Sequence, residues 1–256
     1  MLISSEGIVL KQRKIANNRR IIILFTKRYG KISAGTGMNE MRKGRAALAI
    51  RPFTYAKYDI FKNRGYYNIN AAEVIRSYYS IGEKLERFSA ASHMIEYLDA
   101  VTEEGEPMPH LFDLSMEMLD VISIAEHNFS TMFDAYLVKT FGMLGIMPEI
   151  RHCLNCGKPY SKTDKDDFAF SVEAGGILCN SCIESAEPVP GGTADSLIFR
   201  PSFDIIVTLH YFIENPLKIF TKVVLKSEYS AELRNILNKY VNYYLDVDIS
   251  GDELSV

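Results

Sequence analysis

The sequence predicts an α+β fold: an N-terminal five-stranded OB-fold barrel followed by an α-helical domain with an inserted zinc-binding module of four cysteines. Three observations predict it. Short segments rich in β-branched and aromatic residues fill the first 80 residues. Apolar residues then recur at helical spacing. All four cysteines fall in two C-x2-C pairs. We therefore expect an OB-fold domain at 1–80 and a helical domain at 81–256, with the module at about 149–190.

Strand-like segments alternate with turns throughout the N-terminal domain. The expected strands are 6–14, 19–26, 31–37, 50–62 and 66–74. Turns are expected at 29–31 and 63–65, and a basic loop at 38–49 has room for a short helical turn. Five short strands favour a small closed barrel. The OB-fold barrel is the leading candidate, and an SH3-like barrel is the alternative.

Helical periodicity begins after residue 80. The expected helices are 82–105, 109–126, 129–145, 202–214 and 229–247, with a turn near Phe220. The segment 129–145 is apolar on most faces, which predicts a buried central helix. A linker-like stretch at 187–192 closes the cysteine segment.

Charge is distributed very unevenly along the chain. Residues 1–80 hold 16 Lys and Arg but only 4 Asp and Glu, a net charge of +12, whereas the remainder carries −15. Such asymmetry suggests that the two parts meet different partners. Clustered cations on a small barrel are typical of a surface that binds a phosphate backbone, so we expect residues 1–80 to form a nucleic-acid-binding domain. The expected DNA-binding residues are Lys11, Arg13, Lys14, Arg19, Arg20, Lys27, Arg28, Lys31, Arg42, Lys43, Arg45 and Arg51.

Aromatic residues are interleaved with these cations, and two interpretations of them stay open. They could stack on bases, as aromatic residues of OB barrels do with single strands. They could equally form the core of the barrel, while the charges keep the domain soluble or are compensated by the acidic remainder. The aromatics concerned are Tyr29, Phe53, Tyr55, Tyr58, Phe61, Tyr66 and Tyr67.

The cysteines are spaced as metal ligands. Cys153, Cys156, Cys179 and Cys182 form two C-x2-C pairs separated by 22 residues, and the intervening sequence predicts a β-hairpin. This layout resembles a zinc ribbon and predicts one structural Zn²⁺. The alternatives are a redox pair or two unrelated pairs of buried thiols.

No sequence motif indicates catalysis. Four thiolates would fill a tetrahedral shell, whereas catalytic zinc keeps a position open for water. The five histidines are scattered, and we find no Walker A sequence and no G-x-S-x-G elbow. We therefore expect a protein that is not an enzyme. A hydrolase with an unrecognised site remains an alternative.

Two further absences bear on location. No apolar run approaches the roughly 20 residues that a membrane-spanning helix needs. The N-terminus lacks the basic and apolar regions of a signal peptide. These observations predict a cytoplasmic protein without a membrane partner, where clustered cysteines bind metal more often than they form disulfides.

Several segments together resemble the RecO family of DNA repair proteins. The matching segments are "EGIVLKQRK" (6–14), "ILFTKRYGKIS" (23–33), "MRKGRAALAIRPFTYAKYDI" (41–60), "YLDAVTEEGEPMPHLFDL" (97–114), "FGMLGIMPEIRHCLNCGKP" (141–159) and "FSVEAGGILCNSC" (170–182). The stretch 16–26 departs from the family pattern, because Asn17, Asn18 and Arg19 stand where the family commonly has Gly, Glu and an acidic residue.

The resemblance implies a recombination mediator without catalytic residues. Such a protein binds single- and double-stranded DNA, anneals complementary strands, and works with RecR and the single-strand-binding protein SSB to load the RecA recombinase at gaps. It would act in the cytoplasm, associated with the nucleoid. The alternative from another class is a zinc-ribbon RNA-binding or translation-associated factor.

Overall fold

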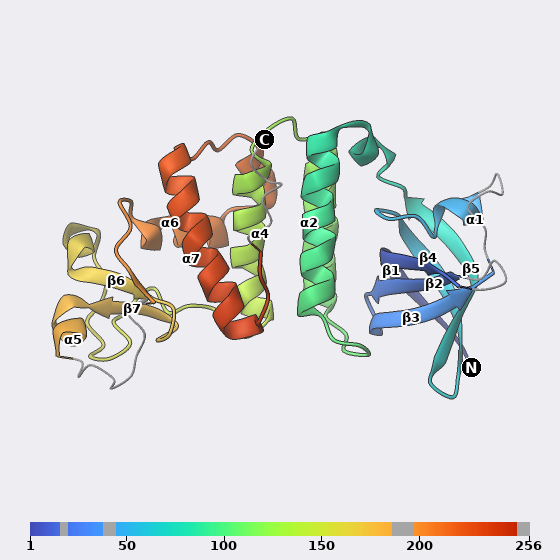
Figure 1. Ribbon diagram of the computed structural model, residues 1–256, viewed down its shortest axis with the longest axis horizontal. Helices are drawn as coiled ribbons and strands as arrows, with labels where there is room; N and C mark the ends of the chain where they lie inside the picture. The colour runs from blue at the N-terminus through green and yellow to red at the C-terminus, as the bar shows by residue number, and fades with distance from the viewer. Residues whose placement is uncertain (16–19, 38–44, 186–196, 250–256) are drawn as a thin grey trace. The chain divides into compact units, whose positions relative to one another are not determined.

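The computed structural model describes residues 1–15, 20–37, 45–185 and 197–249 (Figure 1). The chain divides into two compact units, 1–129 and 130–252. The predicted division at residue 80 falls at the end of the barrel, but helices α2 and α3 belong to the same compact unit as the barrel. The assignment of separate domains to 1–80 and 81–256 stays a prediction.

The N-terminal unit contains a closed five-stranded barrel, as predicted. Its strands are β1 (Leu2–Lys14), β2 (Arg20–Thr26), β3 (Gly30–Thr36), β4 (Tyr55–Asn63) and β5 (Tyr66–Arg76). They pair in the order β1-β2-β3-β5-β4, and β1 closes the barrel against β4. This order is that of an OB-type barrel. The barrel closes on its other side by a short parallel pairing of β3 with β5, which joins Ala34 to Tyr67 and Gly35 to Asn68.

Buried and exposed residues alternate along the strands, and the buried side chains fill the barrel. The core cluster contains Ile3, Val9, Ile22, Leu24, Ile32, Ala34, Ala49, Ile50, Ala56, Tyr58, Ile60 and Ile69. Tyr58 is fully buried, and its hydroxyl donates a hydrogen bond to the carbonyl oxygen of Ala49 at 2.6 Å. The hydrogen bond satisfies the polar end of this side chain in an apolar interior. The core interpretation is therefore correct for this aromatic residue.

The segment before β4 differs from the prediction. We expected a strand from residue 50, but β4 begins at Tyr55. Phe53 has a positive φ of 58°, which is incompatible with an extended strand. Ahead of it lies a short helix, α1 (Arg45–Leu48), which matches the expected helical turn. The rest of the predicted loop, residues 38–44, lies outside the described residues.

The two predicted hairpin turns of the barrel are present. In the β4–β5 turn, Arg64 and Gly65 have φ values of 46° and 85°, as a type I′ turn requires. At the β2–β3 turn, Gly30 has a φ of 64°, and a Cβ atom there would lie 2.1 Å from the carbonyl oxygen of Glu106. Glycine is therefore required at residue 30 both by the backbone conformation and by the close approach of the α2–α3 loop.

Two helices follow the barrel in the same unit. A 3₁₀ turn, η1 (Tyr79–Glu83), leads into α2 (Leu85–Val101), and α3 (Pro109–Ile124) comes next. Phe112 of α3 packs against Phe25 and Tyr55 of the barrel, with ring centroids 5.7 and 6.0 Å apart. Aromatic pairs at these separations add to the apolar burial that holds the two parts together.

The described part of the C-terminal unit is built on three helices and a 3₁₀ turn, apart from the cysteine module: α4 (Phe129–Met143), α6 (Ile205–Glu214), η3 (Leu217–Thr221) and α7 (Ser227–Leu245). Almost every residue of α4 from 131 to 141 is buried, as expected for a central helix. Asp134 of α4 is fully buried and accepts a hydrogen bond from Nε of Arg234 in α7 at 2.6 Å. Among the residues that the structure describes, no helix is both long and apolar enough to cross a bilayer.

The cysteine module belongs to the C-terminal unit. It contains a 3₁₀ turn, a three-stranded sheet ordered β7-β6-β8, and a short helix. These elements are η2 (Lys162–Asp167), β6 (Phe168–Ser171), β7 (Gly176–Cys179), α5 (Asn180–Glu184) and β8 (Ile198–Phe199). The antiparallel β6–β7 hairpin is the one that the sequence predicts between the cysteine pairs. The short strand β8 was not expected.

Candidate metal centre and nucleic-acid interface

The first cysteine pair lies in a tight turn. The N–H group of Gly157 donates to the carbonyl oxygen of Cys153 at 2.9 Å, and the N–H group of Cys153 donates to that of Lys158 at 2.8 Å. Gly157 has a φ of 75°, which a residue with a side chain rarely adopts. This turn folds the chain back so that Cys153 and Cys156 lie on the same side.

The second pair lies where the hairpin ends. Cys179 is the last residue of β7, and Cys182 belongs to α5. The turns are tied together by the N–H group of Cys179, which donates to Sγ of Cys153 at 3.3 Å. Gly176 permits a close backbone contact with Glu149, because a Cβ atom at residue 176 would lie 2.2 Å from the carbonyl oxygen of Glu149. The residues flanking the cysteines thus fix both pairs relative to each other.

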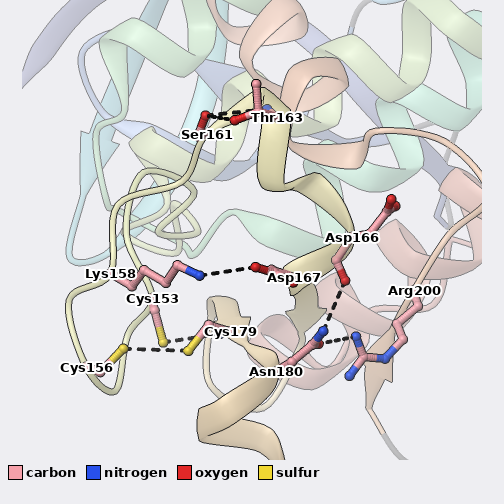
Figure 2. Close-up of polar contacts among 10 residues, drawn as sticks. All are labelled: Cys153, Cys156, Lys158, Ser161, Thr163, Asp166, Asp167, Cys179, Asn180 and Arg200. Atoms are coloured by element: carbon pink, nitrogen blue, oxygen red, sulfur yellow. Dashed lines mark hydrogen bonds and ion pairs between the residues drawn. The ribbon is translucent and has the colours of Figure 1, made fainter.

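The four sulfur atoms converge. The Sγ atoms of Cys153, Cys156, Cys179 and Cys182 all lie within 4.8 Å of one another. The Sγ atoms of Cys156 and Cys179 are 3.6 Å apart, and Figure 2 shows them facing each other beside Cys153. In a tetrahedral site with metal–sulfur bonds of about 2.3 Å, sulfur atoms lie about 3.8 Å apart. The four cysteines therefore form a cluster that can hold a metal ion, as the spacing predicts.

The protonation of the thiols also suits a cation. Burial alone would raise the pKa of Cys153, but the backbone N–H groups of Cys156, Cys179 and Asn155 outweigh it and lower that pKa to about 6. Hydrogen bonds with the sulfur atoms of Cys179 and Cys156 raise the pKa of Cys182 to about 12. Four neighbouring thiols cannot all ionise without a compensating positive charge, and a divalent ion would supply it.

Polar contacts brace the module around this cluster. The ammonium group of Lys158 lies 3.2 Å from the carboxylate of Asp167. The side-chain amide of Asn180 donates to the carbonyl oxygen of Asp166 at 3.1 Å, and Arg200 donates to Asn180 in turn (Figure 2). These contacts hold η2 and the residues after β8 against α5. His152, the histidine nearest in sequence, contacts Glu149 rather than a sulfur atom.

Three of the predicted DNA-binding lysines bind carboxylates within their own unit. Lys11 and Lys31 both approach Asp99 of α2, with N–O distances of 2.6 and 3.3 Å. Lys27 approaches Asp113 of α3 at 2.6 Å. The acidic helices therefore compensate part of the positive charge of the barrel, which the sequence left open as an alternative. The acidic partners themselves carry no recognisable sequence signal.

The remaining predicted cations divide into four groups. Arg13, Lys14, Arg28 and Arg51 are exposed, and none of them forms an ion pair with any described residue. Arg20 is only 8% exposed and donates to the side-chain oxygen of Gln12 at 2.8 Å. Arg45 begins α1, although its side chain is not described. Arg19, Arg42 and Lys43 lie outside the described residues.

The predicted aromatics also separate into two groups. Phe53 and Tyr58 are buried, and Tyr29, Tyr55 and Tyr67 are partly buried. Phe61 and Tyr66 are 47% and 76% exposed. A groove between β3 and β5 runs beside Tyr66. No sequence pattern predicts it, because it depends on how the barrel closes. The core interpretation holds for Tyr58, and Tyr29 and Tyr67 pack against the barrel core. Phe53 and Tyr55 instead contact Phe88 of α2 and Phe112 of α3. The exposed pair is available for contacts with a ligand.

The fold and site define a class of protein: an OB-type barrel with a cationic surface, joined to a helical unit that carries a four-cysteine cluster. The family model described as "Recombination protein O N terminal" matches residues 1–78, and "Recombination protein O C terminal" matches residues 82–250. The chain belongs to the RecO family of DNA repair proteins.

Curated relatives are similar in sequence to this chain over almost its full length. It is 30% identical to the DNA repair protein RecO of Bacillus pumilus, covering 95% of this chain and 90% of that protein. It is 28% identical to RecO of Bacillus subtilis, with the same coverage of both chains. It is 27% identical to RecO of Alkaliphilus metalliredigens, covering 96% and 95%.

Proposed function

We propose that this protein is a non-enzymatic recombination mediator whose barrel binds single- and double-stranded DNA through phosphate contacts. The observation that carries the proposal is a set of exposed cations on the barrel that form no ion pair with any described residue: Arg13, Lys14, Arg28 and Arg51. Cations without internal partners gain free energy when they neutralise phosphates and release counterions. Phosphate contacts position a strand and carry little sequence information.

The same positive charge on the barrel would promote annealing of complementary strands. Two complementary strands repel each other, and a cationic surface that binds both lowers the cost of bringing them together. On SSB-coated gaps, the chain would act with RecR to load the recombinase, in the cytoplasm and associated with the nucleoid. Membership of a family of DNA repair proteins supports this role.

The metal in the cysteine cluster is proposed to be one structural Zn²⁺. Four sulfur ligands in a compact cluster match the preference of zinc for tetrahedral thiolate sites. A closed shell of four thiolates provides no position for a reacting water. The described strands of the module are short, because β6 and β7 have four residues each and β8 has two. The ion would stabilise the fold of this module.

A strand-annealing assay tests the function. Labelled complementary oligonucleotides are mixed with the full chain, first bare and then coated with SSB. We expect the chain to speed annealing in both cases, with little dependence on sequence. A structured RNA is added as competitor. Preference for the RNA over single-stranded DNA, together with no acceleration of annealing, would contradict the proposal and favour a zinc-ribbon RNA-binding factor.

A further inference from the structure

A groove of about 640 Å³ opens on the barrel where β3 and β5 meet. Its polar and aromatic lining residues are Lys31, Ser33, Tyr66, Tyr67, Asn68 and Glu104. Its walls are the β4–β5 hairpin on one side and strands β2 and β3 with the α2–α3 loop on the other. Figure 1 shows this hairpin running past the rest of the barrel near the N-terminus. The groove therefore combines a projecting β-ribbon with a fixed sheet.

The hairpin wall is aromatic and cationic. Tyr66 is 76% exposed, so its ring faces solvent rather than the core. The ammonium group of Lys62 lies 5.2 Å from the ring centre of Tyr67, a cation–π contact that keeps positive charge at the groove. Arg64 is exposed at the turn. Residues 60–72 contain no carboxylate, so this wall suits an aromatic ligand with negative charge beside it.

The opposite wall offers hydrogen-bonding groups at fixed positions. The hydroxyl of Ser33 donates to a carboxylate oxygen of Glu104 at 3.0 Å. Among the described residues that line the groove, Glu104 is the only carboxylate. The seam itself is narrow, because a Cβ atom on Gly35 would lie 2.8 Å from Oδ1 of Asn68. Asn68 and Glu104 are both exposed, so their amide and carboxylate groups are accessible to the donor and acceptor edges of a nucleobase.

We infer that this groove binds an unpaired base of single-stranded DNA. Tyr66 stacks on the face of the base, Asn68 and Glu104 meet its edge, and Lys62 and Arg64 contact the flanking phosphates. The bases of a duplex are stacked inside the helix and cannot enter. The inference deepens the proposed function, on which it rests. It assigns to one groove the discrimination of single strands from duplexes, which cations alone do not provide.

The test replaces the stacking ring. Tyr66→Ala removes it, Tyr66→Phe keeps it, and Tyr79→Ala is the matched control, because Tyr79 is 71% exposed in the same unit but does not line the groove. Binding of an oligo-dT strand and of a duplex of equal length is measured by fluorescence anisotropy. We expect Tyr66→Ala to weaken binding of the single strand about tenfold and to leave the duplex unchanged. The other two variants should match the unaltered chain.

A second readout does not depend on affinity. The chain contains no tryptophan, so Tyr66→Trp would introduce a unique fluorophore into the groove. Stacking of a base on the indole should quench its emission when oligo-dT is added, whereas the duplex should leave it nearly unchanged. Thermal melts of each variant confirm that the exposed substitution leaves the fold intact.

The possible outcomes distinguish failure of this inference from failure of the proposed function. Unchanged binding of the single strand by Tyr66→Ala, or an equal loss for strand and duplex, overturns the base-binding groove but leaves DNA binding by the barrel standing. Loss confined to SSB-coated strands would assign the groove to a protein partner and overturn the inference. Failure of the unaltered chain to bind either DNA would overturn the proposed function and the inference together.

Discussion

The barrel and the cysteine module are both small β structures, but they are stabilised in different ways and carry opposite charge. The barrel closes around a continuous apolar core of Ile, Leu, Val, Ala and Tyr side chains. The module contains two strands of four residues and one of two among its described residues, and its four sulfur atoms gather at the hairpin end. The barrel can therefore fold by burial of apolar surface, whereas the module is expected to depend on a bound metal.

Charge separates the two regions further. Residues 1–80 carry a net charge of +12, while residues 149–185 hold four basic and six acidic residues, a net of −2. Four thiolates around a divalent ion would make the module more negative still. A polyanion such as DNA should therefore contact the barrel and avoid the module. The cysteines attract attention in the sequence, but the proposed DNA-binding surface lies in residues 1–80, which contain no cysteine.

The largest effect is expected from removing the metal. Cys179→Ala deletes one of four ligands, and structural zinc contributes on the order of 10 kcal/mol to folding of small metal-dependent domains. We expect loss of metal from the purified chain and a fall of more than about 10 °C in the melting temperature of the C-terminal unit. Binding of DNA by the barrel should persist.

The matched control for this variant is Ser181→Ala, an exposed residue between the two ligands of the second pair. Metal content is measured by mass spectrometry and unfolding by circular dichroism. Absence of metal from the unaltered chain, together with the same melting temperature for the unaltered chain and Cys179→Ala, would contradict the dependence of the module on a metal.

The next largest effect concerns the exposed cations without an ion-pair partner among the described residues. Arg13→Glu with Lys14→Glu reverses two exposed charges of the barrel. We expect the affinity for single-stranded DNA to fall at least tenfold at low salt. The logarithmic dependence of affinity on salt should become shallower by about 1.4, or about 0.7 for each lost phosphate contact.

Lys218→Glu with Lys222→Glu is the matched control, because it makes the same change of net charge at two exposed lysines of the C-terminal unit. Binding isotherms over a range of salt concentrations provide the comparison. Equal losses in both double variants would show that net charge, and not the surface of the barrel, determines the affinity.

A smaller effect is expected for the cations that are already paired. Partial burial would raise the pKa of Asp99, but the ammonium groups of Lys11 and Lys31 outweigh it and hold that pKa below its usual value. A carboxyl group with a lowered pKa stabilises the fold above its unfolded pKa of about 3.9, and this contribution is lost as the pH falls below that value. Asp99→Asn should therefore cost about 1 kcal/mol or less at neutral pH.

Urea unfolding from pH 6 to pH 3 checks this expectation. The difference in stability between the unaltered chain and Asp99→Asn should shrink as the pH falls toward 3. A difference that stays constant over this range would show that the ion pairs with Lys11 and Lys31 do not couple the barrel to α2.

The smallest expected effect distinguishes two neighbouring residues. Lys27 is bound to Asp113, whereas Arg28 is exposed and forms no ion pair with any described residue. Arg28→Gln should weaken DNA binding a few-fold, and Lys27→Gln should weaken it less, because the charge of Lys27 is already partly neutralised. Equal effects, measured in the same anisotropy assay, would mean that pairing does not determine which cations reach DNA.

Local sequence patterns predicted much of the fold. Alternation in the first 80 residues identified five strands, and cysteine spacing identified a hairpin and a metal cluster, because both depend on nearby residues. The start of β4 was missed because Phe53 adopts a positive φ that its residue type does not signal. The pairing of Lys11 and Lys31 with Asp99 was missed because it joins residues far apart in the chain. Such contacts depend on tertiary packing, which one sequence does not reveal.

The most direct test of the account is to map where DNA touches the full chain. A single-stranded oligonucleotide with photoreactive thymine analogues is cross-linked to the protein, and the modified peptides are identified by mass spectrometry. We expect cross-links within residues 1–80, concentrated near Arg13, Arg28 and the β4–β5 hairpin. Cross-links concentrated in residues 149–185 would contradict it, because they would place DNA on the acidic cysteine module instead of the basic barrel.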